Sequence, residues 1–91
     1  MTTVRGTFLV KNKLGLHARA AAKLTQTASR FPCEVTAGNG EQSVNAKSVM
    51  GLLLLCGAKG TELFIEATGE RAEEAVAAIG ALIEARFGEE E

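Results

Sequence analysis

The stretch NKLGLHAR, residues 12–19, joins a strand-like run to an alanine-rich run, and it decides how the first half of the chain is expected to fold. Gly15 supplies the flexible point of a loop. Small apolar residues then recur at helical spacing, which predicts a helix over residues 18–29 that ends before Pro32. The sequence therefore places His17, the only histidine of the chain, at the start of a helix.

The start of a helix is a favourable place for an anion. Its first backbone N–H groups have no partner within the helix, and the helix dipole is positive at that end. A phosphate on His17 would meet several donors there without a metal, among them the amides of Ala18 and Arg19. The same field favours a neutral, nucleophilic imidazole. Arg19 is unfavourable beside the helix dipole unless it meets an anion, so we expect it to neutralise a phosphoryl group.

Position alone leaves other interpretations of these two residues open. His17 could serve as a loop or capping histidine that satisfies backbone groups. Arg19 could be an ordinary exposed side chain of the first helical turn. A wider pattern is needed to decide between these roles and phosphate chemistry.

Alternation and turn-forming residues predict the remaining elements. Asn39 and Gly40 predict a tight hairpin between two short strands, and Gly88 is a candidate for the residue that follows the last helix. We expect residues 89–91 to form a solvated tail. The order β-α-β-β-α-β-α suggests an α+β open-faced β-sandwich. The predicted strands cover residues 2–10, 33–37, 42–45 and 61–67, and the predicted helices cover residues 18–29, 49–55 (ended by Gly57) and 71–87.

Two motifs in this sequence resemble those of a known family. Residues 12–19 resemble the phosphorylation-site loop of the histidine-containing phosphocarrier protein, HPr, and the stretch NAKSVMGLL, residues 45–53, is similar to its regulatory-serine region. The resemblance spans almost the whole chain and implies a single HPr-like domain over residues 1–91, in which three helices cover one face of a four-stranded antiparallel sheet. Ala20 departs from the family, which commonly has proline there. Alanine suits a helix, so we expect the site to be preserved.

The resemblance also implies a function and partners. His17 would accept a phosphoryl group from enzyme I of the phosphoenolpyruvate-dependent phosphotransferase system and pass it to a histidine of a IIA-type acceptor, which makes the protein a carrier and not an enzyme. Ser48 is placed to cap the short helix, and the similar serine of some members is phosphorylated by an HPr serine kinase/phosphatase. Val49, Met50 and Leu53 would form a partner-docking patch around His17, with ordinary core packing as the alternative.

The composition fits a small globular chain of 91 residues, 46% of them hydrophobic and 23% charged, with a net charge of −1. No basic stripe accompanies the four Phe, which argues against nucleic acid and acidic membrane surfaces as partners. The longest apolar run, residues 52–56, is too short to span a bilayer, and no segment resembles a signal peptide, so we expect a cytoplasmic protein. We also expect a monomer. Cys33 and Cys56 lack metal-ligand spacing, so we expect buried thiols, no metal and no cofactor, with a disulfide or redox role as the alternative.

Two other functions stay open. A regulatory module of the same fold could act through protein partners without transferring phosphate, although His17 together with Arg19 favours transfer. A small ferredoxin-like enzyme has less support, because no paired acid and base can be recognised. The sequence does not decide between sugar uptake, a nitrogen-related phosphorelay and metabolic regulation.

Overall fold

A computed structural model describes residues 1–55 and 57–91 of the chain. Its order of elements is the predicted β-α-β-β-α-β-α, followed by one short 3₁₀ turn. The elements are β1 (Thr3–Leu9), α1 (Ala18–Ser29), β2 (Glu34–Gly38), β3 (Ser43–Asn45), α2 (Val49–Leu54), β4 (Glu62–Thr68), α3 (Ala72–Glu84) and η1 (Arg86–Gly88).

The four strands form one sheet in the order β1-β4-β2-β3, and every neighbouring pair is antiparallel. Strand β4, one of the two inner strands, shows the alternation that the sequence predicted: Leu63, Ile65 and Ala67 are fully buried, whereas Glu62 and Phe64 are exposed. Apolar side chains thus line one face of the sheet, and the other face is open. The predicted open-faced sandwich with a four-stranded antiparallel sheet is confirmed.

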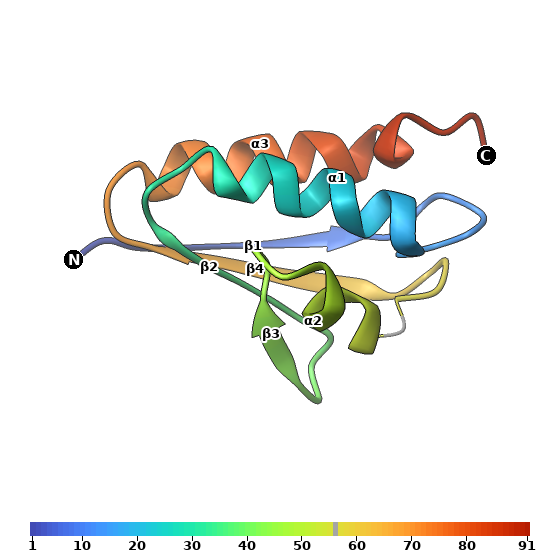
Figure 1. Cartoon of the computed structure of the whole chain (residues 1–91), viewed down its shortest axis with the longest axis horizontal. Coiled ribbons are helices and arrows are strands. Elements are labelled where there is room, and N and C mark those ends of the chain that lie inside the picture. The colour runs from blue at the N-terminus through green and yellow to red at the C-terminus, as the bar shows by residue number, and fades with distance from the viewer. Residues whose placement is uncertain (56) are drawn as a thin grey trace.

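Helices α1 and α3 lie side by side over one face of the sheet, and α2 packs against α1 and β3 (Figure 1). Close packing of α3 on β1 depends on Gly80, because a Cβ atom there would stand 2.4 Å from the ring of Phe8. The core lies between the two layers. Its largest fully buried apolar side chains are Val10, Leu24, Val35, Leu52, Leu63, Ile65, Ile79, Ile83 and Phe87.

The last helix ends earlier than its periodicity predicted. Helix α3 stops at Glu84, and the chain then makes the turn η1, in which Phe87 adopts a φ of 55° and is fully buried. Gly88 follows with a φ of 80°, and its amide donates to the carbonyl oxygen of Ala85. Burial of Phe87 therefore continues the apolar pattern after the helix has ended, which is why the predicted helix to residue 87 was too long.

Two other boundaries also differ. Helix α2 ends at Leu54, and Gly57 accepts a bond from the amide of Leu16 instead of closing the helix. The hairpin loop between β2 and β3 has four residues, 39–42. Oδ1 of Asn39 accepts hydrogen bonds from the backbone amides of Glu41 and Gln42. Cys33 is a buried free thiol, as predicted, whereas the prediction for Cys56 lies outside the described residues.

Candidate functional site

The loop that leads into α1 is fixed by Gly15 and Asn12. Gly15 has a φ of 67°, and a Cβ atom on it would stand 2.3 Å from the carbonyl oxygen of Gly57, so a glycine is required on both counts. The fully buried Asn12 donates from Nδ2 to the Gly15 carbonyl oxygen over 2.7 Å. These contacts hold the chain in one path up to His17.

His17 is the N-cap residue of α1, with extended backbone angles φ −77° and ψ 177°. Its carbonyl oxygen accepts the first bond of the helix from the amide of Ala21 over 2.8 Å, but its side chain makes no capping bond. The three helix amides before Ala21, those of Ala18, Arg19 and Ala20, have no carbonyl partner within the helix. Where proline would remove a donor, Ala20 keeps its N–H.

The His17 ring contacts a carboxylate from the far end of the chain. Its Nε2 atom lies 2.5 Å from Oε2 of Glu89, and the guanidinium of Arg19 lies 3.6 Å from the same oxygen. Asn12 donates to the other carboxylate oxygen, Oε1, over 2.9 Å. Bonding by Asn12, followed by that of His17, lowers the pKa of Glu89 below its ordinary value. Four side chains from three segments of the chain thus meet at one point.

Glu89 reaches this point because the segment around it is anchored. The side chain of Phe87 is buried, and its carbonyl oxygen accepts a bond of 2.6 Å from Lys23 Nζ. The amide of Glu89 donates to Arg86, and Lys13 donates from its amide to the backbone oxygen of Glu91. The prediction of a solvated tail is therefore wrong at Glu89, whose side chain is only 13% exposed.

Comparison with known proteins adds to this geometry. Residues 4–85 match the family model described as the PTS HPr component phosphorylation site, where PTS is the phosphotransferase system. The chain belongs to the HPr family. It is 51% identical over 80 residues to the phosphocarrier protein HPr of Neisseria meningitidis serogroup A, which covers 88% of this chain and 90% of that protein. It is also 44% identical over 89 residues to the phosphocarrier protein NPr of Shewanella violacea, with 98% of each chain covered.

A solved structure shows the same likeness in three dimensions. The crystal structure of HPr-C-His from Thermoanaerobacter tengcongensis matches with a TM-score of 0.90 and 44% sequence identity, and all of both chains is covered. The family, its phosphocarrier character and its fold therefore agree with the resemblance seen in the two sequence motifs.

Two shallow hollows flank His17 in this HPr-family chain. One, of about 240 Å³, is mostly apolar, and the other, of about 370 Å³, is mostly charged. His17 therefore lies between an apolar wall on one side and a wall of mixed charge on the other. The apolar hollow is lined by Leu14, Leu16, His17, Gly57 and Ala58, and the charged hollow by Lys13, Leu14, Arg19, Glu89, Glu90 and Glu91.

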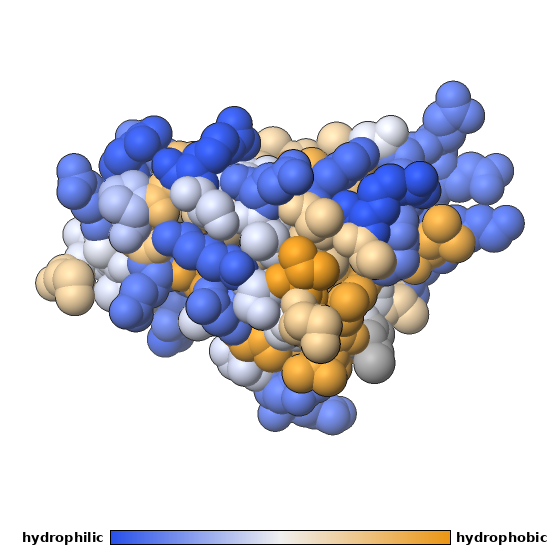
Figure 2. Space-filling model, viewed as in Figure 1, coloured by the Kyte–Doolittle hydropathy of each residue, from blue (hydrophilic) through white to orange (hydrophobic). Residues whose placement is uncertain are grey.

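Helix α2 presents apolar surface beside the start of α1 (Figure 2). Met50 and Leu53 are 75% and 37% exposed, as the docking prediction requires, whereas Val49 is partly buried and packs against the core. Leu54 of the same helix is 67% exposed, and Leu14 adds further exposed apolar surface from the loop before His17.

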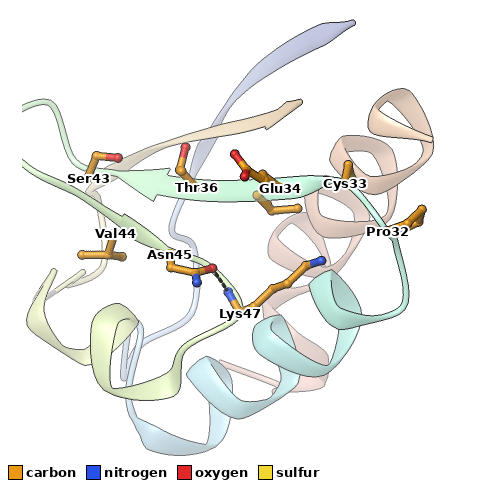
Figure 3. A pocket seen from close by; sticks show the side chains of 9 residues that line it. Pro32, Cys33, Glu34, Thr36, Ser43, Val44, Asn45 and Lys47 are labelled. Atoms are coloured by element: carbon orange, nitrogen blue, oxygen red, sulfur yellow. Dashed lines mark hydrogen bonds between the residues drawn. The ribbon is translucent and has the colours of Figure 1, made fainter. Parts of the chain in front are cut away.

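Ser48 lies at the start of α2. Its Oγ accepts a bond of 3.1 Å from the amide of Gly51, which confirms the predicted cap. A further hollow of about 430 Å³ lies along β2 and β3 (Figure 3). It holds no histidine, and its Lys47 is bonded to the carbonyl oxygen of Phe31, so we assign it no chemistry.

Sequence reasoning missed the parts played by Asn12 and Glu89. Asn12 lies inside the motif of residues 12–19. An asparagine at this position did not by itself indicate that its amide would donate both to the loop and to a distant carboxylate. Glu89 lies 72 residues from His17 in the chain, and no local pattern pointed to it.

In residues 1–55 and 57–91, no three side chains of His, Cys, Asp or Glu gather as a metal site would need. No helix in those same ranges is long and apolar enough to cross a membrane.

Proposed function

We propose that the chain accepts a phosphoryl group on His17 from enzyme I and passes it to a histidine of a IIA-type acceptor. The observation that carries the proposal is the start of α1, where a half-buried histidine makes no capping bond and leaves three helix amides without intrahelical partners. Such a terminus binds anions without a metal. Membership of a phosphocarrier family supports the same chemistry.

Arg19 supplies the mobile charge that this chemistry needs. Its side chain is 65% exposed and lies 3.6 Å from Glu89, so it can turn to a phosphoryl group on the His17 ring without breaking a packed contact. Together with the amides of Ala18 and Arg19, it would neutralise the oxygens of that group.

Transfer of this kind asks little of the protein beyond alignment. The phosphorus–nitrogen bond of a phosphohistidine has a ring nitrogen as its leaving group, so the electron pair returns to the ring when the bond breaks. Alignment with the partner and charge neutralisation then supply most of the rate enhancement. The proposed role is therefore that of a carrier between two partner proteins in the cytoplasm, acting as a single copy of the chain.

Exposed apolar side chains of α2 and of the loop before α1 support docking around His17. Met50, Leu53, Leu54 and Leu14 offer an apolar surface of the kind that protein partners cover. Ser48 is a candidate for phosphorylation by a serine kinase, because a phosphate at a helix start is tolerated electrostatically and would place negative charge on this docking surface.

The test is direct phosphorylation. The purified chain is mixed with phosphoenolpyruvate, Mg²⁺ and an enzyme I that phosphorylates its own HPr, and the product is followed by intact mass and ³¹P NMR. We expect one acid-labile phosphate on the wild type and on Ser48→Ala, and none on His17→Ala. Absence of phosphate from the wild type, or its persistence in His17→Ala, would overturn the proposal and favour the regulatory module.

A further inference from the structure

We infer that Glu89 is a positioning residue, which holds the Nε2–H of His17 so that Nδ1 presents its lone pair to the phosphoryl donor. The inference rests on the proposed function and deepens it, because it names the group that prepares the nucleophile. The family match ends at residue 85, so the match does not include this contact.

The atoms in contact decide which tautomer the His17 ring adopts. Nε2 of His17 lies 2.5 Å from Oε2 of Glu89. An ionised carboxylate can only accept, so Nε2 must carry the hydrogen of this bond. In a neutral imidazole one nitrogen donates and the other accepts, which leaves the lone pair on Nδ1. The opposite tautomer would place a lone pair against the carboxylate and is disfavoured.

The carboxylate is held in place and kept ionised. The side chain of Glu89 is 13% exposed, and its other oxygen accepts a 2.9 Å bond from Asn12, which is itself fully buried and bonded to Gly15. Arg19 adds a positive charge at 3.6 Å from Oε2. Both contacts favour the charged form, which agrees with the lowered pKa of Glu89. A fixed, ionised acceptor is what orientation of a ring requires.

Phosphoryl transfer then balances without movement of a proton. The Nδ1 lone pair forms a bond to the phosphorus, the bond between phosphorus and its donor group on enzyme I breaks, and the leaving atom of that group keeps the electron pair. The His17 ring now carries a positive charge with the hydrogen still on Nε2, directly opposite the Glu89 carboxylate. On transfer to the acceptor, a ring nitrogen of its histidine forms the new bond to phosphorus, while the Nδ1–phosphorus bond breaks and its electron pair returns to Nδ1. Glu89 thus stabilises the cationic ring during carriage, and Arg19 can turn to the phosphoryl oxygens.

Neighbouring charges provide a matched control. Lys13 pairs with Glu91 over 3.9 Å, Lys11 pairs with Glu84 over 2.5 Å, and Glu90 accepts from Arg86 through its backbone oxygen. None of these bonds involves the ring of His17. Replacement of Glu90 therefore changes the charge of the same segment by the same amount, but leaves the contact between Glu89 and the ring in place.

The experiment uses the single histidine of the chain, since labelling with ¹⁵N-histidine reports on His17 alone. Wild type, Glu89→Ala, Glu89→Gln and Glu90→Ala are compared by the ¹⁵N shifts of the neutral ring and by the single-turnover rate of phosphoryl transfer from phosphorylated enzyme I. We expect a protonated Nε2 in the wild type and a mixture of tautomers in Glu89→Ala, with transfer slowed about tenfold by loss of a charged hydrogen bond. Glutamine still accepts the N–H, so Glu89→Gln should keep the tautomer with an intermediate rate. Glu90→Ala should keep the wild-type tautomer and slow transfer less than Glu89→Ala does; an equal slowing would assign the effect to the charge of the segment and would overturn the inference.

Several results would overturn the inference. Identical ring shifts and rates in wild type and Glu89→Ala would show that the contact does not prepare the nucleophile, even though phosphorylation of His17 stands. Faster transfer in Glu89→Ala would make the carboxylate a competitor of the phosphoryl group. Absence of phosphate from the wild type would remove the proposed function and this inference together, whereas a phosphorylated wild type with ring shifts and rates equal to those of Glu89→Ala would remove the inference alone.

Discussion

The starts of α1 and α2 share the same backbone geometry but differ in what their first side chain does. His17 before α1 and Ser48 before α2 are both N-cap residues with extended backbone angles. The Ser48 side chain bonds the amide of Gly51 and so satisfies its own helix, whereas the His17 side chain turns away to Glu89. The start of α2 is thus stabilised locally, while the start of α1 keeps its amides for an anion. An uncapped helix start therefore indicates an anion site more strongly than a capped one does.

The largest effect is expected from giving α1 the cap that α2 has. His17→Ser should abolish phosphoryl acceptance completely, because serine lacks the ring nitrogen. It should nevertheless be more stable than His17→Ala by about 1 kcal/mol, since serine can cap the helix and alanine cannot. Chemical denaturation of both variants, with the phosphorylation assay alongside, checks the pair. Equal stability of the two would contradict the view that the start of α1 lacks a cap.

A second effect concerns docking on α2. Met50→Glu places a charge on an exposed apolar side chain, so we expect the KM for enzyme I to rise about tenfold with the fold intact. Phe64→Glu is the control, because Phe64 is also exposed but lies on the strand β4. An unchanged KM in Met50→Glu, or an equal rise in both variants, would argue against docking on α2.

Removal of the α2 cap should lower the unfolding free energy and leave phosphoryl transfer unchanged. Ser48→Ala loses the bond to the Gly51 amide, which costs about 1 kcal/mol of unfolding free energy. The rate of phosphoryl transfer to His17 should stay at the wild-type value. Thermal unfolding measures the stability of Ser48→Ala, and the single-turnover assay measures its transfer rate. A large loss of transfer in a fully folded variant would contradict the prediction, because it would show that the start of α2 affects the chemistry at the start of α1.

The contact at Glu89 predicts a pH dependence of stability. Bonding by Asn12, and then by His17, lowers the pKa of Glu89 in the folded chain below its ordinary value of 4.5. The contribution of Glu89 to the unfolding free energy is therefore complete above about pH 4.5 and is lost as the pH falls through the lower folded-state pKa. The stability difference between wild type and Glu89→Gln should shrink over that acid range. Glu90→Gln serves as the control, and a difference that grows with acid would contradict the prediction.

The smallest effect is expected at Ala20. Ala20→Pro restores the residue common in the family at a first-turn position whose amide has no helical acceptor, so we expect a change in unfolding free energy within about 1 kcal/mol. Transfer to His17 should persist at a similar rate. Thermal unfolding and the transfer assay check it; loss of folding would show that buried Ala20 cannot accept the larger ring.

Much of this molecule follows from short-range patterns. Alternation in β4, the serine before α2 and the glycine in the loop before α1 each act on residues a few positions away, so sequence alone predicted the fold and placed His17 at a helix start. The exposed side chains of α2 were predicted less well, because periodicity in six residues cannot decide which of several leucines faces the core.

The contact of Glu89 with His17 lay beyond such patterns. It depends on where α3 stops, and that in turn depends on Phe87, whose side chain fills the core from a backbone with positive φ. Three glutamates at the end of the sequence otherwise look like any solvated run. A tertiary contact across 72 residues needs the packed molecule before it can be seen.

The most direct test of this account is the position of the phosphorus on the ring. The chain labelled with ¹⁵N-histidine is phosphorylated by enzyme I, and the coupling between ³¹P and each ring nitrogen of His17 is measured. We expect coupling to Nδ1, with the hydrogen retained on Nε2 opposite Glu89. Coupling to Nε2 would contradict it, because phosphorus would then occupy the atom that Glu89 holds.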